Sequence, residues 1–142
     1  MESIMSKIKP TLIEIIRVEG PSALCGKVQK AGSWHEANMI LRANSTTAPK
    51  GGAYDKHNFK VTFADGAVYF GLYYLRHWQD ETPDLARHVR TFFEYLAGTA
   101  PAWMHEKPEV LALYQKDREA NPEQVAAAKR WLETYDLGQA AL

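Results

Sequence analysis

The chain contains a single cysteine among its 142 residues, Cys25. One cysteine excludes an internal disulfide bond and a cysteine-based zinc site. No two of the five histidines have the i, i+4 spacing of a His-Glu-x-x-His motif. We therefore predict that the protein binds no metal, and no motif indicates another cofactor.

Long apolar runs are also absent. No apolar segment approaches the roughly 20 residues that a membrane-spanning helix requires. The first residues, Met-Glu-Ser-Ile-Met-Ser-Lys, lack the basic segment and apolar core of a secretory signal. We expect a cytoplasmic protein without a membrane partner. The 17 basic and 17 acidic residues give a formal net charge of zero, which argues against a protein that coats nucleic acid.

Motifs for covalent or phosphate chemistry are missing as well. The chain has neither a Gly-x-Ser-x-Gly motif nor the spacing of a phosphate-binding loop. Lys27 follows Cys25 by two residues and could activate it, but a lone cysteine beside a leucine usually packs as a small apolar side chain. We predict a protein that is not an enzyme, and a small enzyme with a Cys- or His-based site remains an alternative.

The clearest pattern in the chain is a β-hairpin over residues 57–74. Its expected turn has two residues, Asp65 and Gly66, because a tight hairpin turn needs positive φ angles that Asp-Gly accommodates. In this register Phe63 pairs with Val68. Side chains alternate between the two faces of a strand, so one face becomes wholly apolar. The expected apolar face consists of Phe59, Val61, Phe63, Val68, Phe70 and Leu72.

The opposite face of the expected hairpin carries the candidate binding residues. Stacking on aromatic rings combined with neutralisation of phosphates is how sheet surfaces hold single-stranded nucleic acid. Tyrosine and threonine also favour exposed strands for structural reasons alone. A tryptophan near the end of an element is a candidate anchor for a protein interface. The predicted binding residues are Lys60, Tyr69, Tyr73, Arg76 and Trp78.

Helices and one further strand are expected on either side of the hairpin. Residues 11–19 are rich in β-branched side chains and predict a third strand, with a short helix as the alternative. Ser33 and Glu36 have the spacing of a capping box at the start of a helix. Thr82-Pro83 and Gly98 mark the start and end of the helix expected to cover the hairpin. The expected helices span residues 33–43, 82–97, 108–120 and 122–135, and residues 44–52 form a loop whose role stays open.

These elements predict one α+β domain over residues 1–142. Its core, residues 11–98, is a small antiparallel sheet of about three strands, with the β-hairpin in the centre, packed against helices. Residues 99–142 add a C-terminal helical pair.

Several short segments together resemble a known type of domain. They are Ser33–Asn38, Ala48–Lys56, Phe59–Gly66, Tyr69–Gly71 and Leu85–Val89. This set resembles one of the large polyvalent protein associated domains, which occur in phage and plasmid proteins. The family pattern carries an arginine after the glycine of the second hairpin strand, where this chain has Leu72. The resemblance implies an origin in a phage or another mobile element, with a part in DNA transfer or in countering host defence, and it implies no catalytic residue.

We therefore expect a non-enzymatic binding module of phage or mobile-element origin. Its expected partner is a host protein or a nucleoprotein complex. The alternative is a single-stranded nucleic-acid-binding protein that uses Lys60, Tyr69, Tyr73 and Arg76. The sequence leaves the oligomeric state open.

Overall fold

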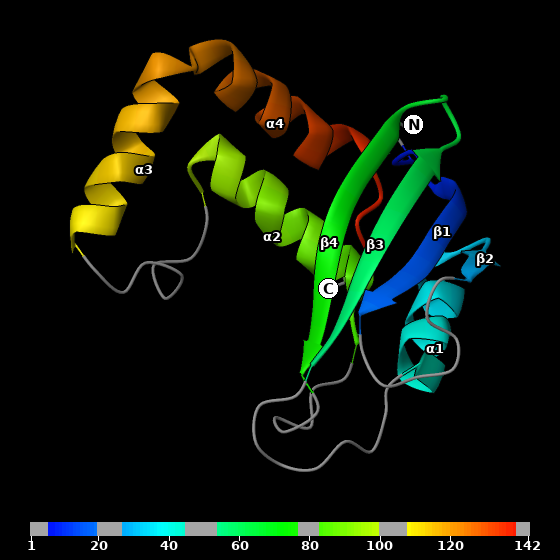
Figure 1. Cartoon of the computed structure of the whole chain (residues 1–142). Coiled ribbons are helices and arrows are strands. Elements are labelled where there is room, and N and C mark those ends of the chain that lie inside the picture. Colours follow the sequence, from blue (N-terminus) through cyan, green and yellow to red (C-terminus); the bar gives the residue numbers. More distant parts are fainter. Residues whose placement is uncertain (1–5, 20–26, 45–53, 77–82, 100–107, 139–142) are drawn as a thin grey trace. The chain divides into compact units, whose positions relative to one another are not determined.

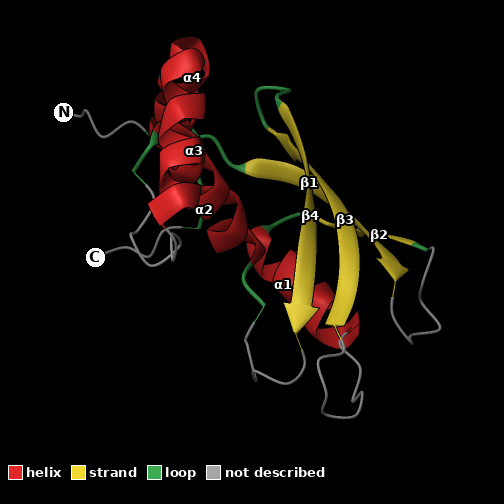
Figure 2. Cartoon of the chain, turned by 60° about the vertical axis from the view of Figure 1, so that its left-hand side comes forward, coloured by secondary structure: helices red, strands yellow, loops and turns green. Residues whose placement is uncertain are grey.

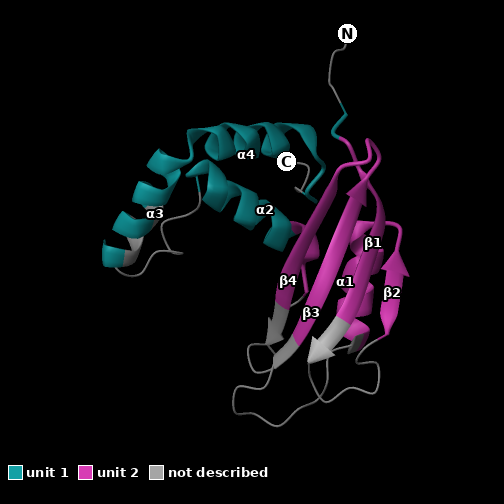
Figure 3. Cartoon of the chain, turned by 45° about the horizontal axis from the view of Figure 1, so that its top comes forward, with its two compact units in different colours: residues 1–7, 87–142 teal, residues 8–86 magenta. Residues whose placement is uncertain are grey.

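The computed structural model describes residues 6–19, 27–44, 54–76, 83–99 and 108–138. The chain divides into two compact units (Figure 3). The sheet unit comprises residues 8–86, and the helical unit comprises residues 1–7 and 87–142.

A four-stranded antiparallel sheet forms most of the sheet unit (Figure 1). Its order is β2-β1-β3-β4, with the two strands of the hairpin adjacent at one side. The predicted α+β class is confirmed, and the strand expected at residues 11–19 lies beside the hairpin. The short strand β2 was not predicted. The strand bounds are β1 Pro10–Glu19, β2 Val28–Ala31, β3 Tyr54–Phe63 and β4 Val68–Arg76.

One face of the sheet, here called the inner face, is buried. Helix α1, Trp34–Asn44, packs against β1 and β2 (Figure 2), and the Trp34 ring meets the Phe63 ring edge-on at a centroid distance of 6.4 Å. The helix thereby removes apolar side chains of the sheet from water, and this burial is the main source of stability for the helix. The buried side chains of the inner face are Ile13, Ile15, Ala31, His57, Phe59, Val61, Phe63 and Tyr73.

Local capping explains where α1 begins. The Glu36 N–H donates to Ser33 Oγ at 3.2 Å, as the capping box predicts. The Glu36 carboxylate accepts a hydrogen bond from the Gly32 N–H at 2.7 Å, one residue earlier than the box requires. The predicted helix start is therefore confirmed.

The hairpin turn has three residues rather than the predicted two. The Phe63 N–H donates to the Ala67 carbonyl at 2.8 Å, and the Gly66 N–H donates to the Phe63 carbonyl at 2.9 Å. Gly66 has a φ of 91°, in the left-handed region. This is the common three-residue hairpin loop, in which a turn is followed by a left-handed glycine. The Asp65 carboxylate accepts the Ala67 N–H at 3.0 Å.

The longer turn shifts the register of the hairpin by one residue. Val68 lies opposite Thr62, and Phe70 lies opposite Lys60, whereas the predicted register paired Val68 with Phe63. A slip of one residue exchanges the two faces of a strand. The predicted face of β3 is right and that of β4 is wrong, because Val68, Phe70 and Leu72 point away from the inner face.

Gly71 gives the hairpin its tightest internal contact. It lies opposite Phe59, and a Cβ atom at Gly71 would lie 2.5 Å from Cζ of the Phe59 ring. The ring therefore covers the glycine backbone, as aromatic side chains do for glycines in other sheets. Gly71 therefore belongs to the inner face, and the Phe59 ring fills the space beside it.

The helical unit contains most of α2, Leu85–Ala97, together with α3, Pro108–Ala120, and α4, Pro122–Thr134. The predicted C-terminal helical pair is confirmed. Helix α2 ends at Gly98, which has a φ of 82°. It packs on α4 through Phe93 and Trp131, whose ring centroids lie 5.1 Å apart.

The start of α2 differs from the prediction. The helix begins at Leu85, and the Leu85 N–H donates to Oδ1 of Asn38 in α1 at 2.8 Å. Thr82, the predicted N-cap, lies outside the described residues. At α4 the predicted N-cap Asn121 makes no side-chain capping bond, and its amide instead donates to the Asp117 carbonyl at 2.8 Å.

No helix in the described part of the chain is long and apolar enough to span a lipid bilayer.

The hairpin register can be tested with paired cysteines in a Cys25→Ser background. Thr62→Cys with Val68→Cys places two cysteines directly opposite each other, where we expect a disulfide to form on mild oxidation. Thr62→Cys with Tyr69→Cys is the control, because these side chains point to opposite faces. Thiol titration of the denatured proteins and intact mass measure the cross-link. A cross-link only in the control pair would contradict the register.

A substitution at Gly71 tests the contact with Phe59. Gly71→Ala introduces a methyl group into the space of the ring, and overpacking of this kind costs about 1–3 kcal/mol of unfolding free energy. Urea denaturation followed by circular dichroism measures the loss. The same substitution in a Phe59→Leu background should cost less, because the ring is absent. An equal cost in both backgrounds would show that the ring is not the cause.

Candidate binding surface

The other face of the sheet, here called the outer face, combines apolar and basic side chains. Of the twelve outer positions whose side chains the structure describes, six are apolar, an unusual share for the face of an antiparallel sheet opposite the core. These six are Leu12, Ile16, Val28, Val68, Phe70 and Leu72. The other six are Glu14, Lys30, Lys56, Asn58, Lys60 and Thr62.

The apolar side chains of the outer face are accessible to solvent. Phe70 is 67% exposed, and Val28 on the opposite side of the sheet is 55% exposed. Val68 and Leu72 flank Phe70 on β4 and are exposed as well. Single exposed apolar residues are normal in soluble proteins, whereas a group on one face is typical of an interaction site.

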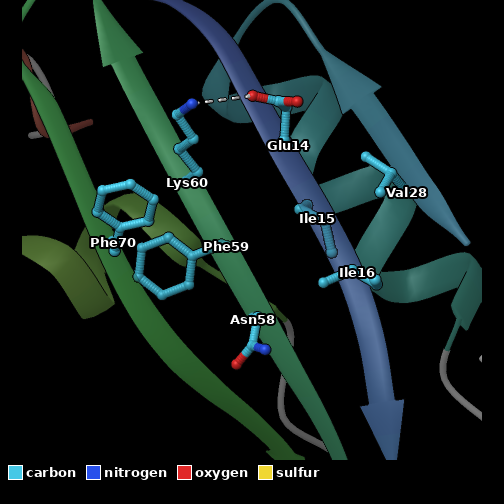
Figure 4. Close-up of a pocket in the computed structure, with 8 residues that line it drawn as sticks. All are labelled: Glu14, Ile15, Ile16, Val28, Asn58, Phe59, Lys60 and Phe70. Atoms are coloured by element: carbon cyan, nitrogen blue, oxygen red, sulfur yellow. Dashed lines mark ion pairs between the residues drawn. The ribbon is translucent and has the colours of Figure 1, made fainter. Parts of the chain in front are cut away.

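A hollow crosses the middle of the outer face (Figure 4). It has a volume of ≈ 210 Å³ and is lined almost entirely by apolar atoms. All four strands contribute to the hollow. It has Phe70 of β4 at one end, and Ile16 of β1 with Val28 of β2 at the other. Pockets for drug-sized ligands usually measure about 300–1,000 Å³. The hollow is therefore suited to one or two side chains of a larger partner.

Lys60 is the polar residue at the centre of this surface. Its ammonium nitrogen lies 4.0 Å from Oε1 of Glu14 and 5.7 Å from the centroid of the Phe70 ring (Figure 4). Both partners attract a cation, the first by charge and the second through the ring quadrupole. Since the Lys60 side chain is 43% exposed, the pair with Glu14 is screened by water and contributes little to stability.

The structure separates the predicted binding residues. Lys60 lies on the outer face, whereas Tyr69 and Tyr73 lie on the inner face, where Tyr73 is buried. The side chain of Arg76 and the whole of Trp78 lie outside the described residues. The predicted group of Lys60 with two tyrosines is therefore wrong, and the cause is the three-residue turn that shifts β4 by one position.

Packing accounts for both tyrosines of the inner face. The Tyr69 ring lies against Phe59 at a centroid distance of 5.9 Å, and burial raises the pKa of its phenol to about 12. The Tyr73 hydroxyl accepts a long hydrogen bond of 3.4 Å from the Asp84 N–H just before α2. Both side chains therefore contribute to the core rather than to a stacking surface.

Sequence reasoning missed the apolar part of the outer face. Val28 was missed because Val-Gln-Lys-Ala is too short to show a strand pattern. Phe70 and its neighbours were assigned to the core through the turn of two residues. The Asp-Gly pair was the available signal. It fits a two-residue turn, and it fits equally a three-residue loop in which the glycine alone has a positive φ.

Side chains that could bind a metal ion do not cluster in the described part of the chain. It contains no group of three or more His, Cys, Asp or Glu side chains that could hold a metal ion. Cys25 lies outside the described residues. His57 is fully buried in the inner face, opposite Tyr73.

Comparison with family models, curated proteins and solved structures found no match to this chain. The resemblance to a phage and plasmid domain therefore stays a prediction.

The raised pKa of Tyr69 predicts how stability changes in alkali. The unfolded chain releases the phenol proton near pH 10 and the folded chain near pH 12, so the stability that Tyr69 contributes is lost between these values. We expect the free energy of unfolding to fall less from pH 9 to pH 11.5 in Tyr69→Phe than in the wild type. Urea denaturation at both pH values measures this, and equal falls would contradict the burial of the phenol.

Proposed function

We propose that this protein is a non-enzymatic binding module that recognises a partner protein through the outer face of its sheet. The observation that carries the proposal is the exposure of Phe70, 67%, at the edge of an apolar hollow that spans all four strands. An antiparallel sheet usually presents polar side chains on the face away from its core. Burying apolar side chains here against a partner would be favourable by about 25 cal/mol per Å² of area removed from water.

The origin and the partner belong to the same proposal. The resemblance to a large polyvalent protein associated domain supports an origin in a phage or another mobile element. A module of this kind would act on a host protein or nucleoprotein complex, in DNA transfer or against host defence. Genes of phage or conjugation functions beside the coding gene would support this part, and neighbouring genes of ordinary metabolism would contradict it.

A second candidate function is the binding of single-stranded nucleic acid. The arrangement that favours it is an exposed phenylalanine, Phe70, beside the ammonium group of Lys60. This surface differs from the predicted one because β4 presents Phe70 and Leu72 on the outer face, where Tyr69 and Tyr73 were expected. Among the twelve outer positions whose side chains the structure describes, Phe70 is the sole aromatic residue and its apolar neighbours are aliphatic, so these positions favour a protein partner over stacked bases.

Removing the Phe70 ring tests the proposed function. We expect Phe70→Ser to lose a partner that the wild type retains in affinity capture from a bacterial lysate treated with nuclease. Leu113→Ser is the matched control, because Leu113 on α3 is 66% exposed and should be dispensable. The partner is then purified and titrated against the three proteins. An aromatic hot spot of an interface is worth about 2 kcal/mol or more, so the affinity of the partner for Phe70→Ser should fall at least about tenfold.

Three results would contradict the proposal. The first is equal retention of the partner by the wild type and Phe70→Ser. The second is equal loss in Phe70→Ser and Leu113→Ser, which would indicate a general loss of solubility. The third is retention that disappears with nuclease, which would favour the nucleic-acid alternative. Circular dichroism spectra confirm beforehand that both variants are folded.

A further inference from the structure

The charges of the outer face indicate what kind of partner it accepts. Among the outer positions whose side chains the structure describes, three lysines, Lys30, Lys56 and Lys60, stand against one acidic residue, Glu14, which leaves an excess of two positive charges. Lys30 is exposed, and Lys60 is 43% exposed. Charge complementarity between two surfaces steers association and excludes partners of like charge. The face therefore favours a partner with carboxylates beside its apolar contact.

The shape of the face favours a helix over an extended peptide. Four strands spaced about 4.8 Å apart make a surface roughly 15–20 Å wide, which a helix of about 10–13 residues can cross at 1.5 Å per residue. One helix can therefore lie across the sheet and place an apolar side chain in the hollow between Phe70 and Val28. An extended peptide instead binds to the edge of a sheet through its backbone and would leave this hollow unfilled.

Two other occupants fit the surface less well. A second copy of the chain would bring two faces of like charge together, each with its excess of lysines. Nucleic acid would satisfy the lysines, but aliphatic side chains such as Ile16, Val28 and Leu72 offer no ring on which bases can stack. A protein segment that is both apolar and acidic satisfies both components of the surface.

We propose that the outer face binds an amphipathic helix of a partner protein, with an apolar stripe flanked by glutamate or aspartate. The apolar stripe covers Phe70 and fills the hollow, and the flanking carboxylates approach Lys60 and Lys30. This inference rests on the proposed function, because it assumes that the outer face is the binding surface, and it adds the chemistry of the ligand.

Designed peptides test this recognition directly with the full-length protein. The probes are two helical peptides of about 15 residues, long enough at 1.5 Å per residue to cross the sheet. Both carry leucines at i, i+3, i+4 and i+7, and one has glutamates and the other lysines beside the stripe. A third probe is an oligothymidylate of about 15 nucleotides. Fluorescence anisotropy measures the affinity of each for the protein at low and at high salt.

We expect the glutamate peptide to bind the wild type and the lysine peptide to bind at least about tenfold more weakly. Lys60→Glu should narrow or reverse this preference, because it replaces an attraction by a repulsion at the centre of the face. Lys129→Glu is the matched control, since Lys129 is exposed on α4 and should leave the preference unchanged. Phe70→Ser should weaken both peptides by removing the apolar contact.

Equal binding of the two peptides, or a preference that Lys60→Glu does not change, would overturn the inference. Binding of the oligonucleotide alone would also overturn it and favour the nucleic-acid alternative. Absence of peptide binding, with a lysate partner that is still lost in Phe70→Ser, would overturn the inference while the proposed function stands. If no peptide binds and Phe70→Ser loses no lysate partner, the inference and the proposed function are both contradicted.

Discussion

The turn between β3 and β4 is the constraint on which the character of the sheet depends. Its backbone hydrogen bonds close a loop of three residues with Gly66 in the left-handed region. Because side chains alternate along a strand, this closure decides which half of the β4 side chains joins the core. Tyr69 and Tyr73 go inward, and Phe70 and its apolar neighbours go outward. The packing of Phe59 over Gly71 then holds the same register from within.

Much of the fold could be predicted because the relevant signals are local. Alternation identified the buried side of β3, Ser33 marked the start of α1, and Gly98 marked the end of α2. Each of these features depends on residues that are neighbours in the sequence. The start of α2 could not be predicted in this way, since its first N–H is bound by Asn38, which lies 47 residues earlier in the chain.

The candidate surface was predicted in part, and the error has one physical source. Lys60 was placed correctly because its face follows from the pattern of β3 alone. The partners of Lys60 depended on the length of the turn, and Asp-Gly is compatible with loops of two and of three residues. In the predicted register β4 also had an entirely apolar inner face. The structure instead places two tyrosines on the inner face, where the Tyr73 hydroxyl accepts a hydrogen bond from the Asp84 N–H and burial raises the pKa of the Tyr69 phenol.

The row formed by Lys30, Glu14 and Lys60 has a consequence for the protein in its free state. The row crosses the sheet between Leu12 and Val68 on one side and Ile16 and Leu72 on the other, and it ends at Phe70 on β4, so charged side chains interrupt the apolar surface. Stacking one sheet on another to form aggregates would strip water from these charges. Charged residues in such positions act as gatekeepers against aggregation. The row therefore opposes the stacking of one outer face on another.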